Sequence, residues 1–258
     1  LNTKNIKYIY DPRGLYERLL SSINYIDTEF MILGCDDEFY LPSALSVCID
    51  FLTKESSFSS CKGRAIGFGT RNKGKEIFGN EQYPKLRNLC LDHDNASERI
   101  SKHFSNYVPA NVFSVMKSNK WQIICKYVFE KEYNFTGVWE LQIEFLVMVS
   151  GKSKVIPELM WMRNLEVAPI RGTSPSMSYD VRIRNWWYQK KFKEEKEDFL
   201  SQMKKACDEF SKDQNFEFTK NEIEKLFEIY IHAPLRVSLL RYNLNIIINK
   251  IKKLMRTT

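Results

Sequence analysis

Apolar and polar positions at the start of the chain alternate between strand-like and helix-like patterns. Residues 6–10 are rich in β-forming side chains and end at an Asp-Pro pair, which predicts a short strand. Leucine and isoleucine recur at helical spacing over residues 15–26, and a second helical pattern runs from Pro42 to about Leu52. Between these helices, the apolar run 29–34 has the length of a buried strand. This order predicts a βαβ unit with acidic residues at the carboxyl end of its second strand, where parallel sheets bind ligands.

The middle of the chain predicts more sheet and one long helix. Glycines punctuate residues 63–78, which predicts a hairpin, and the mixed, polar residues 83–106 predict a cover for the sheet. Residues 137–149 predict a helix that is apolar on most faces, and residues 154–162 predict a returning strand. Two apolar stretches fit either a strand or a helix, namely residues 113–116 and 121–129.

The end of the chain is helical in pattern. Residues 171–178 predict a loop that separates two parts. Helical patterns follow near residues 188–212, 219–232 and 235–256. We therefore expect an α/β domain over residues 1–178, with a mixed sheet flanked by helices, and a helical C-terminal region over residues 179–258.

Composition and charge narrow the class of protein. With 43% hydrophobic and 14% aromatic residues, the chain can bury a substantial core. Its formal net charge is +7, but six of the basic residues and no acidic residue fall between Arg236 and the end of the chain. The remainder is close to neutral, so we expect no nucleic-acid partner. Six scattered cysteines without a CxxC pair, and no apolar run of membrane-spanning length, predict a reduced, cytoplasmic protein.

The acidic cluster Asp36-Asp37-Glu38 directly follows the apolar run 29–34. Side chains alternate along a strand, so Asp36 and Glu38 can share a face while Asp37 turns away. Carboxylate oxygens suit hard divalent cations, and such an ion can hold a diphosphate on its other side. One interpretation is therefore a metal and phosphate site, and the other is a solvated turn that caps the helix from Pro42.

Residues 23–45 resemble a segment of GT-A enzymes similar to glycosyltransferase family 2. In that segment a helix precedes a strand that ends in a DxD-type motif, and an apolar pair, a proline and another helix follow. Residues 137–140 and 150–163 are similar to the second half of such domains. The pattern Pro-Glu-Leu, Met-Arg, Pro-Ile-Arg-Gly and Trp-Trp up to Trp187 is similar to bacterial glycosyltransferases associated with surface polysaccharide. The resemblance covers roughly residues 6–187, and it implies a GT-A-like, Rossmann-like fold.

This resemblance implies a metal-dependent glycosyltransferase. The enzyme would move a sugar from a nucleotide-sugar donor, expected to be a UDP-sugar, to a hydroxyl of a glycan or lipid-linked acceptor, with inversion. Asp36, Asp37 and Arg163 would bind the donor. Asp37 and Glu38 would hold Mn²⁺ or Mg²⁺, although the family usually has Asp where this chain has Glu38.

The resemblance also implies a catalytic base at the start of the helix over residues 137–149. Glu140 occupies that place, but the family commonly has a Glu-Asp pair there and Glu140 is followed by Leu141. Glu144 lies one turn later on the same face and is therefore a second candidate. The first two strands of such domains have no counterpart in the sequence, and residues 6–10 would correspond to the third. Because position 1 is also Leu, we expect the domain to be N-terminally incomplete.

Several alternatives stay open at this level. A nucleotidyltransferase also uses acids after a βαβ strand, and a non-catalytic scaffold or membrane-associated module would use the acidic cluster only as a cap. The basic, amphipathic stretch 235–256 predicts docking against the domain or peripheral contact with the inner face of the membrane. Around His93, a surface loop is favoured over a metal site. For Trp186 and Trp187, packing in the core is favoured over stacking on sugar rings.

Overall fold

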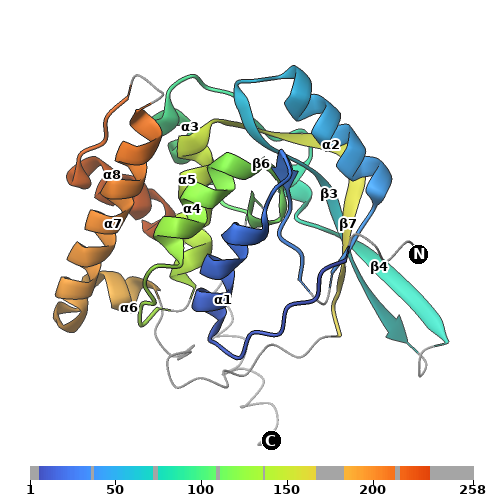
Figure 1. Cartoon of the computed structure of the whole chain (residues 1–258), viewed down its shortest axis with the longest axis horizontal. Helices are drawn as coiled ribbons and strands as arrows, with labels where there is room; N and C mark the ends of the chain where they lie inside the picture. Colours follow the sequence, from blue (N-terminus) through green and yellow to red (C-terminus); the bar gives the residue numbers. More distant parts are fainter. Residues whose placement is uncertain are drawn as a thin grey trace, which may run out of the picture.

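A computed structural model describes residues 6–35, 38–71, 75–108, 111–135, 137–166, 183–212 and 216–232 (Figure 1). Over these residues the strands form one mixed sheet in the order β1-β6-β3-β7-β2, with β4 on β3 and β5 on β7. The strands are β1 (Phe30–Met31), β2 (Glu38–Tyr40), β3 (Phe58–Arg71), β4 (Glu76–Gln82), β5 (Cys90–Leu91), β6 (Val115–Lys117) and β7 (Lys152–Asn164). Strands β3 and β7 are parallel, and the other pairs are antiparallel. The predicted mixed sheet of an α/β protein is confirmed.

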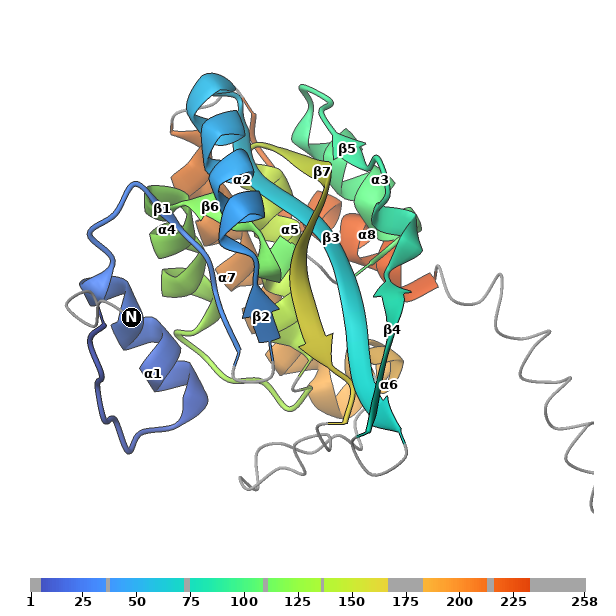
Figure 2. The ribbon, with the colours of Figure 1, turned by 90° about the vertical axis from the view of Figure 1, so that its right-hand side faces the viewer.

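Helices cover both faces of the sheet. They are α1 (Leu15–Ser22), α2 (Pro42–Lys54), α3 (Ala96–Ser105), α4 (Ser118–Val128), α5 (Val138–Ser150), α6 (Ile183–Tyr188), α7 (Lys193–Ser211) and α8 (Lys220–His232). Four short 3₁₀ segments connect them, namely η2 (Ile23–Tyr25), η3 (Pro84–Leu86), η4 (Asn111–Phe113) and η5 (Lys190–Phe192). Helix α2 lies on one side of the sheet, and α4, α5, α7 and α8 lie on the other (Figures 1 and 2).

Strand β3 shows how the sequence sets these two faces. Cys61 belongs to the apolar cluster that includes Cys48 of α2, whereas the next side chain, Lys62, points to Asn111 on the α5 side. This is the alternation expected of a strand. Between β3 and β7 the register shifts at Gly63, where a Cβ atom would lie 2.5 Å from the Glu158 carbonyl oxygen. Only glycine allows the two strands to approach so closely.

Helix α5 forms the centre of the core. Its side chains from Leu141 to Ser150 are all buried, which fits a helix that is apolar on most faces. Trp186 and Trp187 are buried in the same core and pack on Phe199 with ring centroids 5.4 and 6.0 Å away. The prediction that this tryptophan pair packs in the core is confirmed.

Most predicted helices and strands form within a few residues of their expected bounds. The helix over 15–26 divides into α1 and η2, the hairpin is β3 and β4, and the two ambiguous stretches become β6 and α4. The predicted helices near 188–212 and 219–232 are α7 and α8, which share one core with α4 and α5. The loop 171–178, the boundary at 178 and the stretch 235–256 lie outside the described residues.

Two expectations about the N-terminal part are wrong. Residues 6–10 form no strand, and Ile6, Tyr8 and Tyr10 are 70, 86 and 78% exposed. The apolar run 29–34 yields only the two residues of β1, which are half-buried and pair only with β6. The expected βαβ unit is therefore not formed. A β-rich composition makes a strand only where a neighbouring strand completes its hydrogen bonds.

The remaining features concern the cysteines and the membrane. All six cysteines are free, in agreement with a chain without disulfides. None of the described helices has both the length and the apolar character that crossing a membrane requires.

Candidate active site

Glu38 and Arg163 lie opposite each other at one end of the sheet. Strand β2 is antiparallel to β7 with Glu38 and Arg163 as Cα partners, and Arg163 is also level with Gly67 of β3. Directly paired residues of neighbouring strands have Cβ atoms about 5 Å apart on one face. This pair therefore lies at the carboxyl ends of the parallel strands β3 and β7, the edge where α/β sheets bind ligands.

The carboxylate of Glu38 is held in place by its surroundings. Glu38 is only 9% exposed, and its Oε2 atom lies 3.0 Å from the hydroxyl of Tyr40. The same hydroxyl lies 3.0 Å from the carbonyl oxygen of Leu33, in the segment that leads to the acidic cluster. Tyr40 thus connects Glu38 to the chain on the other side of Asp36 and Asp37, which lie outside the described residues.

Glu140 lies in the first turn of α5 and is partly buried. Burial raises the pKa of Glu140, the nearby charge of Glu144 adds to this rise, and the guanidinium of Arg163 opposes it. Arg163 is therefore an electrostatic neighbour of Glu140 and the cross-strand partner of Glu38. Arg163 thus relates to both glutamates that the resemblance singled out, to Glu38 by strand pairing and to Glu140 by charge.

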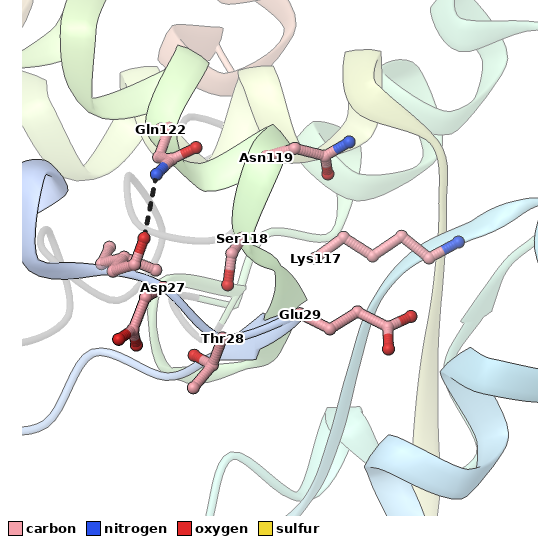
Figure 3. Close-up of a pocket in the computed structure, with 8 residues that line it drawn as sticks. Asp27, Thr28, Glu29, Lys117, Ser118, Asn119 and Gln122 are labelled. Carbon is pink, nitrogen blue, oxygen red and sulfur yellow. Dashed lines mark hydrogen bonds between the residues drawn. The ribbon is translucent and has the colours of Figure 1, made fainter.

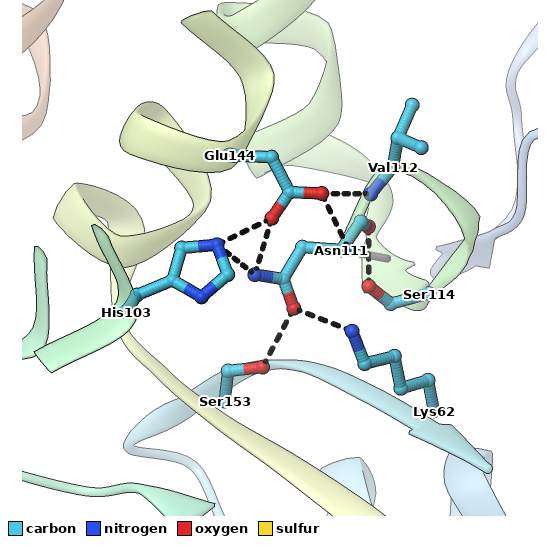
Figure 4. Close-up of polar contacts among 7 residues, drawn as sticks. All are labelled: Lys62, His103, Asn111, Val112, Ser114, Glu144 and Ser153. Carbon is cyan, nitrogen blue, oxygen red and sulfur yellow. Dashed lines mark hydrogen bonds and ion pairs between the residues drawn. The ribbon is translucent and has the colours of Figure 1, made fainter. Parts of the chain in front are cut away.

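Glu144, the second candidate base, is fully buried one turn further along α5. Its Oε1 atom accepts a hydrogen bond from the backbone N–H of Asn111 at 2.7 Å, and its Oε2 atom accepts one from Asn111 Nδ2 at 2.7 Å. His103 Nε2 also lies 2.7 Å from Oε2 (Figure 4). A carboxylate that is enclosed and hydrogen-bonded in this way cannot meet an acceptor hydroxyl, so the geometry favours Glu140 as the base.

Glu144 belongs to a buried polar cluster that the sequence analysis missed. Its members are Lys62, His103, Asn111, Ser114, Glu144 and Ser153, from β3, α3, η4, α5 and β7 (Figure 4). Lys62 Nζ donates to Asn111 Oδ1 at 3.2 Å, and Ser153 Oγ donates to the same oxygen at 3.3 Å. Burial lowers the pKa of Lys62 to about 8, and the Glu144 carboxylate opposes that shift. One sequence signal was present, since Lys62 is a charged residue next to Cys61 in a strand that reads as part of the sheet.

The carboxylate of Glu38 fits a hard divalent cation. Glu38 offers carboxylate oxygen, the kind of ligand that Mg²⁺ and Mn²⁺ prefer, and Mg²⁺ is commonly held by one or two carboxylates together with substrate phosphates. Within the ranges that the structure describes, no three His, Cys, Asp or Glu side chains gather into a metal-binding group. The two acids next to Glu38 fall in the gap between those ranges.

A pocket of about 350 Å³ lies elsewhere, between the segment before β1 and the start of α4 (Figure 3). Ser118 N donates to the Glu29 carbonyl oxygen at 2.9 Å, and Gln122 Nε2 donates to that of Ile26 at 3.3 Å. Strand β6 ends at this pocket and pairs with β3 at Ser60. The distance along β3 from Ser60 to the end of the sheet where Glu38 lies is about 20 Å, so the pocket is separate from that end. None of the predicted site residues lines it.

The segment around His93 is a surface loop, as favoured from the sequence. His93 Nδ1 lies 3.4 Å from Glu98 Oε2, and Lys152 Nζ forms an ion pair with Asp94 at 2.6 Å. These contacts are exposed pairs between neighbouring elements, and they explain the charged residues of the loop without a metal.

Comparison of the chain with known protein families and with curated proteins finds no match.

Proposed function

We propose that the protein is a metal-dependent glycosyltransferase that moves a sugar from a nucleotide-sugar donor to a hydroxyl of a glycan or lipid-linked acceptor. One observation carries the proposal: Glu38 and Arg163 pair at the carboxyl ends of β3 and β7, and the charge of Arg163 acts on the carboxyl group of Glu140. These residues provide the last acid of the Asp36-Asp37-Glu38 cluster, a cation, and a carboxyl group whose pKa is raised. This is the combination that sugar transfer from a diphosphate requires.

Each residue has a separate task in this proposal. Glu140 accepts the proton of the acceptor hydroxyl while the acceptor oxygen attacks the anomeric carbon of the donor. The bond from that carbon to the phosphate oxygen breaks, and the nucleoside diphosphate leaves with the electron pair. Arg163 faces the negative charge that develops on the leaving group. The raised pKa of Glu140 strengthens it as a base.

Mn²⁺ or Mg²⁺, when bound, supplies positive charge that neutralises the diphosphate. Glu38 would hold it together with Asp37, and Asp36 would bind the donor. The hydrogen bond between Tyr40 and Glu38 limits the carboxylate to one side of β2, and this orients the carboxylate for binding the metal ion.

The test measures donor binding and product identity. We expect UDP to raise the melting temperature in the presence of Mn²⁺, and UDP-glucose, UDP-galactose or UDP-N-acetylglucosamine to be turned over with release of UDP. Asp36→Asn and Glu38→Gln should each abolish the Mn²⁺-dependent shift, whereas Glu197→Gln, at an exposed position of α7, should keep it. An unchanged shift in both site variants, or release of pyrophosphate from a nucleotide substrate, would contradict the proposal.

A further inference from the structure

Two tyrosines from different parts of the chain pack against each other on the helical side of the sheet. Tyr107 follows α3, and Tyr230 lies on α8 in the helical C-terminal region. Their ring centroids are 4.7 Å apart with the planes at 73°, and Phe104 packs against Tyr230 at 5.7 Å. Both tyrosines are only partly buried, so they border the surface of the protein.

Packing places this pair along the face of α5 that carries both glutamates. The His103 ring lies 5.5 Å from the Tyr107 ring, and His103 Nε2 lies 2.7 Å from the Glu144 carboxylate. Glu140 is one turn away from Glu144 on that face. In agreement with this placement, the pKa values of both phenols are raised, first by burial and also by the charge of Glu140.

Glu140 therefore interacts electrostatically with two kinds of group. The guanidinium of Arg163, on β7 at the end of the sheet that we assign to the donor, opposes the rise in the pKa of Glu140. The charge of Glu140 in turn contributes to the raised pKa values of Tyr107, which follows α3, and of Tyr230 on α8. A tyrosine offers an apolar ring for the carbon face of a sugar and a hydroxyl for its polar edge. With raised pKa values, both phenols keep their protons and can donate hydrogen bonds at neutral pH.

We propose that Tyr107 and Tyr230 form the acceptor side of the active site and bind a sugar ring that presents its hydroxyl to Glu140. This inference rests on the proposed function and adds the acceptor class, a pyranose ring. It also gives α8 a direct part in the active site, because Tyr230 comes from the region beyond residue 178.

The test separates acceptor binding from donor binding. Transfer from the active UDP-sugar would be measured with methyl and octyl glycopyranosides as acceptors, for Tyr107→Phe, Tyr230→Phe and Tyr230→Ala. We expect Tyr230→Ala to raise the KM for the acceptor about 10-fold more than the KM for the donor. Each Phe variant, which loses only the hydroxyl, should raise the acceptor KM about 3- to 10-fold. The acceptor KM should rise in the same way for the methyl and the octyl glycosides, because the site binds the sugar ring. A rise seen only with the octyl glycosides would contradict the proposal and indicate binding of the lipid chain.

Control variants distinguish a loss of acceptor binding from a loss of folding. Tyr188→Ala, at a 53% exposed tyrosine of α6, should leave both KM values unchanged. The Tyr230→Phe variant preserves the packing on Phe104 and decides the question if Tyr230→Ala does not fold. An unchanged acceptor KM in folded Phe variants, or equal rises for donor and acceptor, would overturn this inference alone. No donor turnover by the unmodified protein would overturn the proposed function and this inference with it.

Discussion

Glu140 and Glu144 lie one turn apart on α5, yet their surroundings differ in every respect that matters for chemistry. Glu144 is fully buried, and groups from α3 and η4 surround its two oxygens at 2.7 Å. Glu140 is only partly buried, and the charges that act on it are those of Glu144 and Arg163. Two residues of the same type on one helix face can thus have very different surroundings, one enclosed by hydrogen bonds and one partly open.

The difference has an energetic basis. Removing a carboxylate from water costs several kcal/mol, which hydrogen bonds and a nearby cation can offset. For Glu144 the donors of Asn111 and the charge of Lys62 supply this compensation, so the carboxylate is stabilised where it lies. For Glu140 the balance is incomplete, since the pKa of this group is raised despite Arg163. A carboxylate whose cost of burial is only partly offset has a raised pKa, which is expected of a general base that accepts a proton.

The largest effect should come from replacing Glu144. Glu144→Ala leaves the donors of His103 and Asn111 without their acceptor and Lys62 without the nearest negative charge. We expect a loss of about 3–5 kcal/mol in the free energy of unfolding, measured by urea denaturation. That is a large part of the roughly 5–15 kcal/mol typical of a folded domain. Glu197→Ala, on the exposed face of α7, should change the stability by less than about 0.5 kcal/mol. A loss below about 1 kcal/mol for Glu144→Ala would show that the buried polar cluster does not hold α5 in place.

The second-largest effect should be on the transfer activity of a variant that still folds. Glu140→Gln keeps the size of the side chain and removes the base, so the transfer rate should fall about 100- to 10,000-fold. The rate of UDP release with acceptor present measures this, and circular dichroism confirms the fold. The contrasting variant is Glu144→Gln, which should lower activity only as far as it unfolds the protein. A folded, inactive Glu144→Gln together with an active Glu140→Gln would assign the base to Glu144.

Sequence patterns predicted those parts of the fold in which local periodicity and burial agree. The segment that became α2 has a clear helical period with Pro42 at its first residue, and those that became α5 and β7 are long apolar runs. Residues 6–10 have the composition of a strand but no neighbouring strand in the described fold, and composition cannot supply one. The change from β6 to α4 at Lys117 has no glycine or proline to mark it, so the pattern around it was ambiguous.

The candidate site was predictable where its residues stand at element ends. Glu38 follows an apolar run, Glu140 opens a helix and Arg163 ends a strand, and each position is visible in the sequence. The buried polar cluster was not visible, because long-range packing brings Lys62, Asn111 and Ser153 together from different elements. For the same reason, nothing in the pattern of α8 indicated that Tyr230 packs against Tyr107. Strand pairing and helix packing, rather than local sequence, create these neighbours.

The smallest expected effect follows from the raised pKa of Glu140 and concerns stability against pH. Because the folded-state pKa is above the unfolded value, the contribution of this group to stability is complete below the unfolded pKa and is lost as pH rises through the folded pKa. Burial makes the largest contribution to this rise in pKa, the charge of Glu144 adds to it and that of Arg163 opposes it, while the phenols of Tyr107 and Tyr230 are uncharged at neutral and acidic pH. Glu140→Gln should therefore be more stable than the unmodified protein at pH 7 to 8, and the difference should shrink as the pH falls toward about 4. Thermal melts across this range, with Glu197→Gln as the reference, measure the difference. If Glu140→Gln were instead less stable than the unmodified protein at pH 8, and its relative stability rose as the pH fell, Arg163 would outweigh burial. Glu140 would then be a structural ion-pair partner like Glu144.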